Sequence, residues 1–259
     1  MKIAIAGKGG VGKSTVASIL ALMLAEQGNR VIALDADPDA NLASSLGISH
    51  SEQRRIVTLS HQIDLIEERT GAKVGQYGQV FKLNPEVSDI ADFYAYKHRG
   101  VALLVLGAVK AGGSGCACPE STFVRALVTD LVLFKEETLI MDMEAGIEHL
   151  GRGTSQGVNV MLVVAEPGQR SVDCALQVER MAREIGIRRI FFVANKITGE
   201  ADCDFLREAF PKREILAFLP FTEELKNADR DSVSPYDCLD SETRGRYGEI
   251  IRCLEKQGV

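Results

Sequence analysis

The stretch of sequence that decides the fold spans residues 7–15 and reads Gly7-Lys8-Gly9-Gly10-Val11-Gly12-Lys13-Ser14-Thr15. A short apolar run, Lys2–Ala6, precedes it. Apolar residues with helical spacing follow from Ser14 to Gln27, and Gly28 is a typical helix stop. The stretch matches the pattern G-x-x-x-x-G-K-[ST] in the context that this pattern requires, between a strand and a helix. The sequence therefore predicts a phosphate-binding loop (P-loop).

The composition of this loop matches the chemistry of phosphate binding. Glycines let the backbone curl so that successive N–H groups point at phosphate oxygens, and the helix N-terminus favours an anion. We expect Lys13 to reach the β- and γ-phosphates of a nucleotide and the Ser14 hydroxyl to bind Mg²⁺. The whole stretch, Gly7–Thr15, is a candidate nucleotide site. A Gly-rich turn without a ligand is the alternative, and the combination of strand, spacing, lysine and hydroxyl argues against it.

Strand-like and helix-like runs alternate along most of the chain. The predicted strands are Lys2–Ala6, Val31–Leu34, Leu103–Leu106, Thr138–Met141, Val160–Ala165, Ile190–Ala194 and Ile215–Phe218. The predicted helices are Ser14–Gln27, Ser121–Phe134, Ser171–Ile185, Asp204–Phe210 and Ser241–Gln257. Most of the strands are continuous apolar runs, which is typical of strands covered on both faces.

This pattern predicts an α/β fold of the P-loop NTPase type. We expect a mostly parallel central sheet of about seven or eight strands, with helices on both faces, in a single P-loop ATPase domain that spans residues 1–259. The polar segment 49–99 fits the alternation least well, and we expect it to form a strand and short helices that flank the sheet.

Composition and charge exclude several classes of protein. With 46% hydrophobic and 25% charged residues, the chain is neither disordered nor of low complexity. Its net charge of −6 disfavours sequence-independent binding to nucleic acid, which needs a basic face. No apolar run is long enough for a membrane helix, and no secretory signal precedes the Gly-rich loop, so we expect a cytoplasmic protein with no membrane partner.

Lys8 is a residue that an ordinary P-loop does not require. With Lys8 one position after the first glycine, the loop resembles that of the deviant Walker A ATPases, which include the nitrogenase iron protein, cell-division and partition ATPases, and metal-centre accessory ATPases. In that family the matching lysine touches the phosphates bound by the partner subunit. The resemblance implies that Lys8 acts in trans and that ATP binding closes a homodimer. The alternative is a solvated loop charge.

Two acidic positions follow strands near the predicted P-loop. The resemblance implies that Asp37, in the segment 35–41 (DADPDAN), orients the attacking water, with Asp35 and Asn41 near the Mg²⁺ shell. An acidic turn before a helix at Leu42, capped by Asp39 or Asn41, is the alternative, and both descriptions are compatible.

The other acidic position, Asp142, ends the apolar run 139–142 (LIMD), as a Walker B aspartate does. It would accept a hydrogen bond from a water on Mg²⁺. Gly146, four residues later, would be the switch II backbone donor to the γ-phosphate.

Recognition of the base is predicted at the ends of two later strands. Asn195 resembles the adenine-reading asparagine of the family, and Pro220 with Phe221 would supply further contacts to the ring. Asn195 as an ordinary turn residue is the alternative. Thr198 stands where a guanine-binding N-K-x-D motif has aspartate, which favours ATP over GTP.

Two of the six cysteines, Cys116 and Cys118, form a C-x-C pair at the end of a Gly-rich loop. Pro119 suits the first position of a helix, so that Cys118 would lie at a helix N-terminus, where the dipole favours a thiolate. Two thiolates leave a metal ion half coordinated, and a two-fold axis would supply the other two. Four sulfurs suit Zn²⁺ in a tetrahedron or Ni²⁺ in a plane. The alternative is a pair of small buried apolar residues.

The segment 142–153 (DMEAGIEHLGRG), together with the P-loop and the C-x-C pair, resembles the nickel-insertion accessory ATPases of carbon monoxide dehydrogenase maturation. The resemblance implies a homodimeric ATPase that carries Ni²⁺ at shared cysteines and helps to load a nickel enzyme. Carbon monoxide dehydrogenase is the expected client, and an accessory role for acetyl-CoA synthase is equally compatible with these motifs.

Two rival functions explain less of the sequence. A nitrogenase-like iron–sulfur electron donor needs a second cysteine, at a position occupied here by His149, which we interpret as a structural residue. A partition or cell-division switch acts on DNA or a membrane, but the chain is acidic and its last segment, Tyr247–Gln257, mixes acidic and basic residues. Neither rival explains Cys116 and Cys118.

Overall fold

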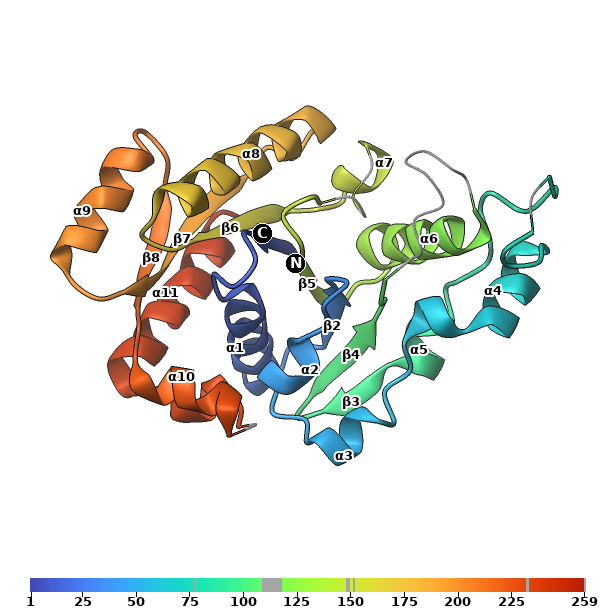
Figure 1. Cartoon of the computed structure of the whole chain (residues 1–259), viewed down its shortest axis with the longest axis horizontal. Helices are drawn as coiled ribbons and strands as arrows, with labels where there is room; N and C mark the ends of the chain where they lie inside the picture. Colours follow the sequence, from blue (N-terminus) through green and yellow to red (C-terminus); the bar gives the residue numbers. More distant parts are fainter. Residues whose placement is uncertain (77, 109–117, 148–149, 151, 232, 259) are drawn as a thin grey trace.

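The computed structural model describes residues 1–76, 78–108, 118–147, 150, 152–231 and 233–258 (Figure 1). Within these residues, eight strands form one sheet in the order β3-β4-β2-β5-β1-β6-β7-β8. The strands are β1 (Lys2–Gly7), β2 (Val31–Ala36), β3 (Tyr96–His98), β4 (Val101–Val105), β5 (Thr138–Met143), β6 (Val160–Ala165), β7 (Ile190–Ile197) and β8 (Ile215–Pro220). The predicted α/β fold, with a mostly parallel sheet of seven or eight strands, is confirmed.

All pairings among these strands are parallel except the pairing of β3 with β4 at one edge. Arg99 and Gly100 join the two edge strands, and both have positive φ (48° and 81°), as a tight two-residue hairpin turn requires. The strand expected within segment 49–99 is therefore β3, at the end of that segment. It is preceded by the short helices α3 (His50–Gln53), η1 (Leu59–His61), α4 (Ile63–Thr70) and α5 (Ile90–Tyr94).

Helices cover both faces of the sheet (Figure 1). Successive residues of a strand point to opposite faces, so Ile3 and Ile5 of β1 join one core cluster while Ala4 and Ala6 join the other. The first cluster includes α1 (Lys13–Glu26), α2 (Leu42–Ser45) and α11 (Ser241–Lys256). The second includes α4, α5, α6 (Pro119–Leu133), α8 (Gln169–Ile185) and α9 (Glu200–Ala209). Double coverage explains why the strands are continuously apolar.

The predicted boundaries are wrong where strands end in polar residues. β2 continues to Ala36 and β7 to Ile197, past the expected ends at Leu34 and Ala194. In β2 the pairing with β5 continues through Asp35 and Ala36 although Asp35 is polar. In β7 the regular pairing with β8 is interrupted after Ala194 and resumes at Ile197. Three further elements carry no clear signal in the sequence: α7 (Arg152–Ser155), α10 (Glu223–Arg230) and η2 (Pro235–Cys238). In the described part of the chain, no helix has the length and apolar composition needed to span a membrane.

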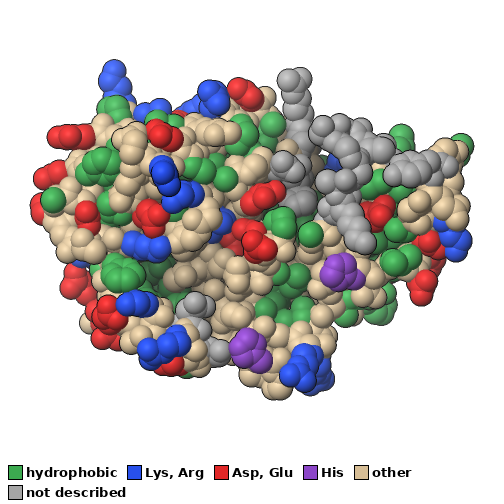
Figure 2. Space-filling view, viewed as in Figure 1, with side chains coloured by type: hydrophobic (Ala, Val, Ile, Leu, Met, Phe, Trp, Pro, Cys, Tyr) green, Lys and Arg blue, Asp and Glu red, His purple; other side chains and the backbone are tan. Residues whose placement is uncertain are grey.

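The described surface carries charges of both signs side by side. Figure 2 shows Lys and Arg side chains interspersed with Asp and Glu over the face in view. Lys and Arg side chains on this face are therefore not gathered into one basic patch.

Candidate functional site

The P-loop connects β1, at the centre of the sheet, to α1. Two of its glycines are required by close packing. A Cβ on Gly7 would lie 2.4 Å from the carbonyl oxygen of Val164, and a Cβ on Gly12 would lie 2.3 Å from Nδ2 of Asn195. Gly12 also has a φ of 94°, in the left-handed region that favours glycine, immediately before the first residue of α1. The loop thus packs against the ends of β6 and β7, and neither glycine position has room for a side chain.

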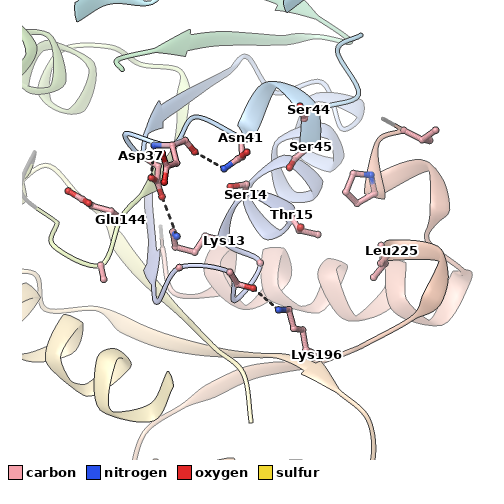
Figure 3. Close-up of a pocket in the computed structure, with 17 residues that line it drawn as sticks. Lys13, Ser14, Thr15, Asp37, Asn41, Ser44, Ser45, Glu144, Lys196 and Leu225 are labelled. Atoms are coloured by element: carbon pink, nitrogen blue, oxygen red, sulfur yellow. Dashed lines mark hydrogen bonds and ion pairs between the residues drawn. The ribbon is translucent and has the colours of Figure 1, made fainter. Parts of the chain in front are cut away.

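A pocket of about 620 Å³ opens above this loop (Figure 3). Its P-loop lining consists of Gly9, Gly10, Gly12, Lys13, Ser14 and Thr15. The rest comes from residues that are distant in the sequence: Asp37, Asp39, Asn41, Ser44, Ser45, Glu144, Ala145, Lys196, Leu225, Val233 and Pro235. The pocket lies at the carboxyl ends of parallel strands, where ligands of open α/β sheets bind, and its size suits a nucleotide.

Lys13 and Asp37 form the central ion pair of this pocket. The Lys13 ammonium nitrogen lies 3.3 Å from Oδ2 of Asp37, and the two side chains point toward one another in Figure 3. Lys13 is 6% exposed, so its charge is directed into the pocket and not into bulk water. The other Asp37 oxygen accepts the backbone N–H of Asp39, which holds the turn after β2 against the P-loop. The structure thus brings together Lys13, which we expect to reach the phosphates, and Asp37, which we expect to orient the attacking water.

Asp142 and Asp35 are neighbours in register at the ends of β5 and β2, and both are fully buried. Burial is the largest cause that raises the pKa of Asp142 to about 6, against the opposing effects of the Ser14 hydroxyl and the Lys13 charge. Burial, with the nearby Asp142 charge, raises the pKa of Asp35 to about 8. Two carboxyl groups at this spacing cannot both ionise freely, so the cluster favours a bound cation.

The two carboxyl groups differ in their partners. Asp35 accepts hydrogen bonds from the backbone N–H groups of Leu42, at 2.9 Å, and Asp37, at 3.3 Å. It therefore shapes the turn 35–42. Asn41 occupies the N-cap position of α2, as the alternative description of this turn has it, but its side chain accepts no hydrogen bond from the helix. Its amide donates to the Asp39 carbonyl oxygen at 2.6 Å.

Both oxygens of Asp142 are buried and lack a hydrogen-bond partner within the described residues. An orphaned buried carboxylate near the Ser14 hydroxyl is a donor set that Mg²⁺ prefers. The residues present therefore fit the metal. Asp142 and Ser14 would hold Mg²⁺, which would neutralise charge on the bound phosphates.

Lys8 lies outside the pocket lining and is 40% exposed. Its ammonium nitrogen lies 3.6 Å from Oε1 of Glu166, the residue that follows β6. Gly7 and Val11 are also absent from the described lining, because their positions face the sheet and the core. Of the nine residues Gly7–Thr15, six therefore line the pocket, Gly7 and Val11 support the loop, and Lys8 faces outward.

The residues predicted to bind the base occupy other positions. The Asn195 amide is buried and donates to the carbonyl oxygen of Val11 at 2.8 Å, so its nitrogen holds the P-loop from below. Pro220 and Phe221 end β8 and begin the next turn, and neither is among the described residues that line the pocket. The structure therefore does not bring these three residues into the cavity.

The end of the pocket away from the sheet is instead lined by Leu225 of α10 and by Val233 and Pro235 at the start of η2. Sequence reasoning missed Leu225 because α10 is almost entirely polar. Thr222 followed by acidic residues is the weak cue to the start of α10 that the sequence contains. Thr222 accepts the backbone N–H of Leu225 at 3.2 Å as an N-terminal cap, and acidic residues follow it in the first turn.

Cys118 is the N-terminal cap of α6. Its sulfur accepts the backbone N–H of Ser121 at 3.4 Å and contacts the Ser121 hydroxyl at 3.2 Å. This confirms the predicted position of Cys118 at a helix N-terminus, with Pro119 in the first turn. Cys116 lies outside the described residues. Within the described residues, no group of three His, Cys, Asp or Glu side chains is arranged to hold a metal ion.

The segment after Asp142 begins with a turn that contains Gly146. Glu144 and Ala145 line the pocket, whereas Gly146 is not part of its described lining. Ile147 follows with a φ of 44°, a strained conformation for a β-branched residue. His149 lies outside the described residues. The predicted switch II segment therefore begins next to the pocket in this structure, and it contains a residue with a strained backbone, Ile147.

Comparison with known proteins identifies the family. Residues 2–235 match the family described as the CobQ/CobB/MinD/ParA nucleotide binding domain. The chain belongs to this family. As a member, it is a P-loop ATPase, which agrees with the P-loop, the pocket above it and the buried carboxylate of Asp142.

Alignments with relatives and with a solved structure extend over most or all of this chain. The carbon monoxide dehydrogenase accessory protein CooC of Rhodospirillum rubrum is 44% identical over 258 residues, covering 100% of this chain and 98% of the relative. An uncharacterized ATP-binding protein of Methanocaldococcus jannaschii is 43% identical, covering 87% of each chain. The MinC:MinD cell division complex of Aquifex aeolicus contains a chain that matches with a TM-score of 0.68 at 18% identity, covering 98% of this chain and 96% of that one, which shows a shared fold alone.

Proposed function

We propose that this ATPase is a metallochaperone that forms a homodimer on binding ATP and delivers Ni²⁺ to a nickel enzyme, with carbon monoxide dehydrogenase as the client. The observation that carries the proposal is the 44% identity, over the whole chain, to a carbon monoxide dehydrogenase accessory protein. Ni²⁺, or Zn²⁺ in its place, is the cargo of this reaction and binds at a site shared by the Cys116 and Cys118 pairs of two copies.

The pocket supports the nucleotide part of the proposal. Lys13 pairs with Asp37 in this structure, and phosphate oxygens are stronger competitors for an ammonium group that is only 6% exposed. Transfer of Lys13 to the phosphates frees the Asp37 carboxylate, 20% exposed, to orient the attacking water. The ion pair between Lys13 and Asp37 thus couples ATP binding to the release of Asp37 for hydrolysis.

The position of Lys8 supports the dimer part. Lys8 lies outside the described lining of its own pocket, and its side chain is 40% exposed. A cation placed there would be available to the phosphates of a second copy. Closure of the homodimer would therefore add a positive charge where negative charge develops during hydrolysis.

Cys118 supports the metal part because it is a free, partly exposed cysteine at the N-terminus of α6. One chain offers two thiolates, and a homodimer offers four, which completes a tetrahedron for Zn²⁺ or a plane for Ni²⁺.

The helix that begins after Cys118 also contacts the segment after switch II. Thr129 of α6 lies 3.0 Å from Thr154 of α7, hydroxyl to hydroxyl. A movement of the segment after Asp142 would therefore reach α6, the helix that Cys118 caps.

The test combines elemental analysis with mass measurement on anaerobically purified protein. We expect one Ni²⁺ or Zn²⁺ per dimer, and an increase from monomer to dimer mass on addition of ATP and Mg²⁺. Changing both Cys116→Ser and Cys118→Ser should remove the metal and leave ATP hydrolysis measurable. Cys174→Ser, in α8, is the matched control and should retain the metal. Stoichiometric metal in the double variant, or a tightly loaded monomer, contradicts the proposal.

A further inference from the structure

Three charged side chains form a row across the carboxyl ends of three neighbouring strands. Lys8 follows β1, Glu166 follows β6, and Lys196 lies near the end of β7. Gly7 pairs in register with Val164, and Ala165 pairs with Ala194, so these three strand ends lie side by side. The Glu166 carboxylate has a lysine on both sides, with Oε1 3.6 Å from the Lys8 ammonium and Oε2 3.0 Å from that of Lys196.

Two of the three members of this row are firmly held. The backbone N–H of Glu166 donates to the Ser171 hydroxyl at 3.0 Å, at the start of α8. The Lys196 ammonium donates to the carbonyl oxygen of Gly10 at 2.5 Å as well as to Glu166. Figure 3 shows Lys196 pointing toward the P-loop. Glu166 and Lys196 therefore form a fixed support beside the loop.

Lys8 is the loosely held member. The two lysines are similarly exposed, but the contact of Lys8 with Glu166 is the longer, 3.6 Å against 3.0 Å for Lys196, and among the described residues its ammonium has no second partner like the Gly10 carbonyl that Lys196 contacts. If Lys8 leaves, Glu166 keeps Lys196 as its partner, so no carboxylate is left unpaired. The geometry therefore allows Lys8 to be released without exposing an uncompensated charge in the row.

We propose that Glu166 is a positioning residue for Lys8, which it holds beside its own P-loop in the nucleotide-free chain and releases when two copies close on ATP. The proposal rests on the trans role of Lys8 in the proposed function. Glu166 competes with the partner's phosphates for Lys8, and thereby sets the protein concentration at which ATP drives closure.

The expected size of the effect follows from the exposure of the pair. An exposed ion pair of this kind changes an equilibrium by about two- to fivefold. Each dimer releases two copies of Lys8, so a roughly threefold effect per chain becomes roughly ninefold in the dissociation constant of the dimer. Glu166→Gln removes the negative charge and keeps the size of the side chain. We therefore expect this variant to dimerise more tightly with ATP than the unmodified protein.

The experiment uses the full chain and two measurements. Sedimentation with Mg²⁺ and a slowly hydrolysed ATP analogue at saturation gives the dimer dissociation constant. Acetylation of the nucleotide-free protein, read by mass spectrometry, gives the reactivity of Lys8 relative to the exposed Lys97. Asp173→Asn is the matched control, because it removes a charge from α8 whose described hydrogen-bond partner is Gln169 and not a lysine of the row.

For Glu166→Gln we expect about two- to threefold faster acetylation of Lys8 and a several-fold lower dimer dissociation constant, with no change in either quantity for Asp173→Asn. Unchanged acetylation would show that Glu166 does not hold Lys8. Faster acetylation with an unchanged dissociation constant would show that the contact does not restrain closure. Either result overturns the inference alone. If the unmodified protein and both variants all stay monomeric with the analogue, the inference and the proposed dimer fail together.

Discussion

Replacing Asp142 by asparagine should stabilise the nucleotide-free protein, although the residue is central to the site. Both carboxylate oxygens are buried and lack hydrogen-bond partners within the described residues, so ionisation of this group opposes folding. An asparagine side chain at this position has nearly the same shape and no charge. The same change should remove the response of the protein to Mg²⁺, because the donor that fits the metal is lost.

The magnitude follows from the pKa of Asp142, which is raised from 3.8 to about 6. At about 1.36 kcal/mol per pH unit, a difference of about 2 corresponds to about 3 kcal/mol. A carboxyl group whose pKa is raised by folding costs nothing below pH 3.8, where both states are protonated. The cost grows as the pH rises to about 6 and is constant above it. Removing the Asp142 charge also relieves Asp35, whose pKa it helps to raise, and this acts in the same direction.

The assay is denaturant unfolding of the unmodified protein and Asp142→Asn at about pH 4 and about pH 8, without nucleotide. The difference between the two free energies of unfolding should be about 2 to 3 kcal/mol more favourable to the variant at the higher pH than at the lower one. Any constant cost of burying the amide cancels in this comparison. A difference that is the same at both pH values would refute the reasoning, because the carboxyl group would then not be ionising against its burial.

Three further substitutions separate the parts of the site. Lys13→Ala should abolish measurable nucleotide binding in calorimetry, because the cation directed into the pocket is lost; binding within about threefold of the original would contradict its role. Lys8→Ala should leave nucleotide affinity unchanged and remove ATP-dependent dimerisation in sedimentation, whereas an unaltered dimer would reject the trans role. Gly12→Ala should destabilise the protein by about 1 to 3 kcal/mol in thermal unfolding, because its φ of 94° and the Asn195 amide leave no place for a methyl group; unchanged stability would show that the loop adapts.

The central part of the fold was predictable because several signals agree there. β1, the P-loop and α1 combine a buried apolar run, a glycine pattern and helical spacing, each with its own physical cause. The carboxylates of Asp37 and Asp142 were also predictable, because each ends or directly follows an apolar strand, and parallel strands end at one edge of the sheet.

The far end of the pocket was not predictable in the same way. Leu225 is the single large apolar residue in α10, so the helix has no apolar stripe for a pattern to detect. Asn195 illustrates another difficulty: its sequence context fits a base-reading residue, and only the structure shows that its amide also donates to the Val11 carbonyl. Which of two hydrogen-bond partners a buried amide takes depends on a tertiary distance. The sequence does not contain that distance.

The charges around the pocket explain why the metal and the nucleotide should arrive together. Lys13 neutralises Asp37, and a proton neutralises Asp35 at neutral pH because its pKa is about 8. Asp142 has a pKa of about 6, so it is ionised at neutral pH with no hydrogen-bond partner among the described residues. When phosphates draw Lys13 away, Asp37 also loses its cation, and the cluster then holds two uncompensated carboxylates. Asp142 and Ser14 would hold Mg²⁺, whose charge would offset this imbalance, so nucleotide affinity should fall sharply when Mg²⁺ is withdrawn.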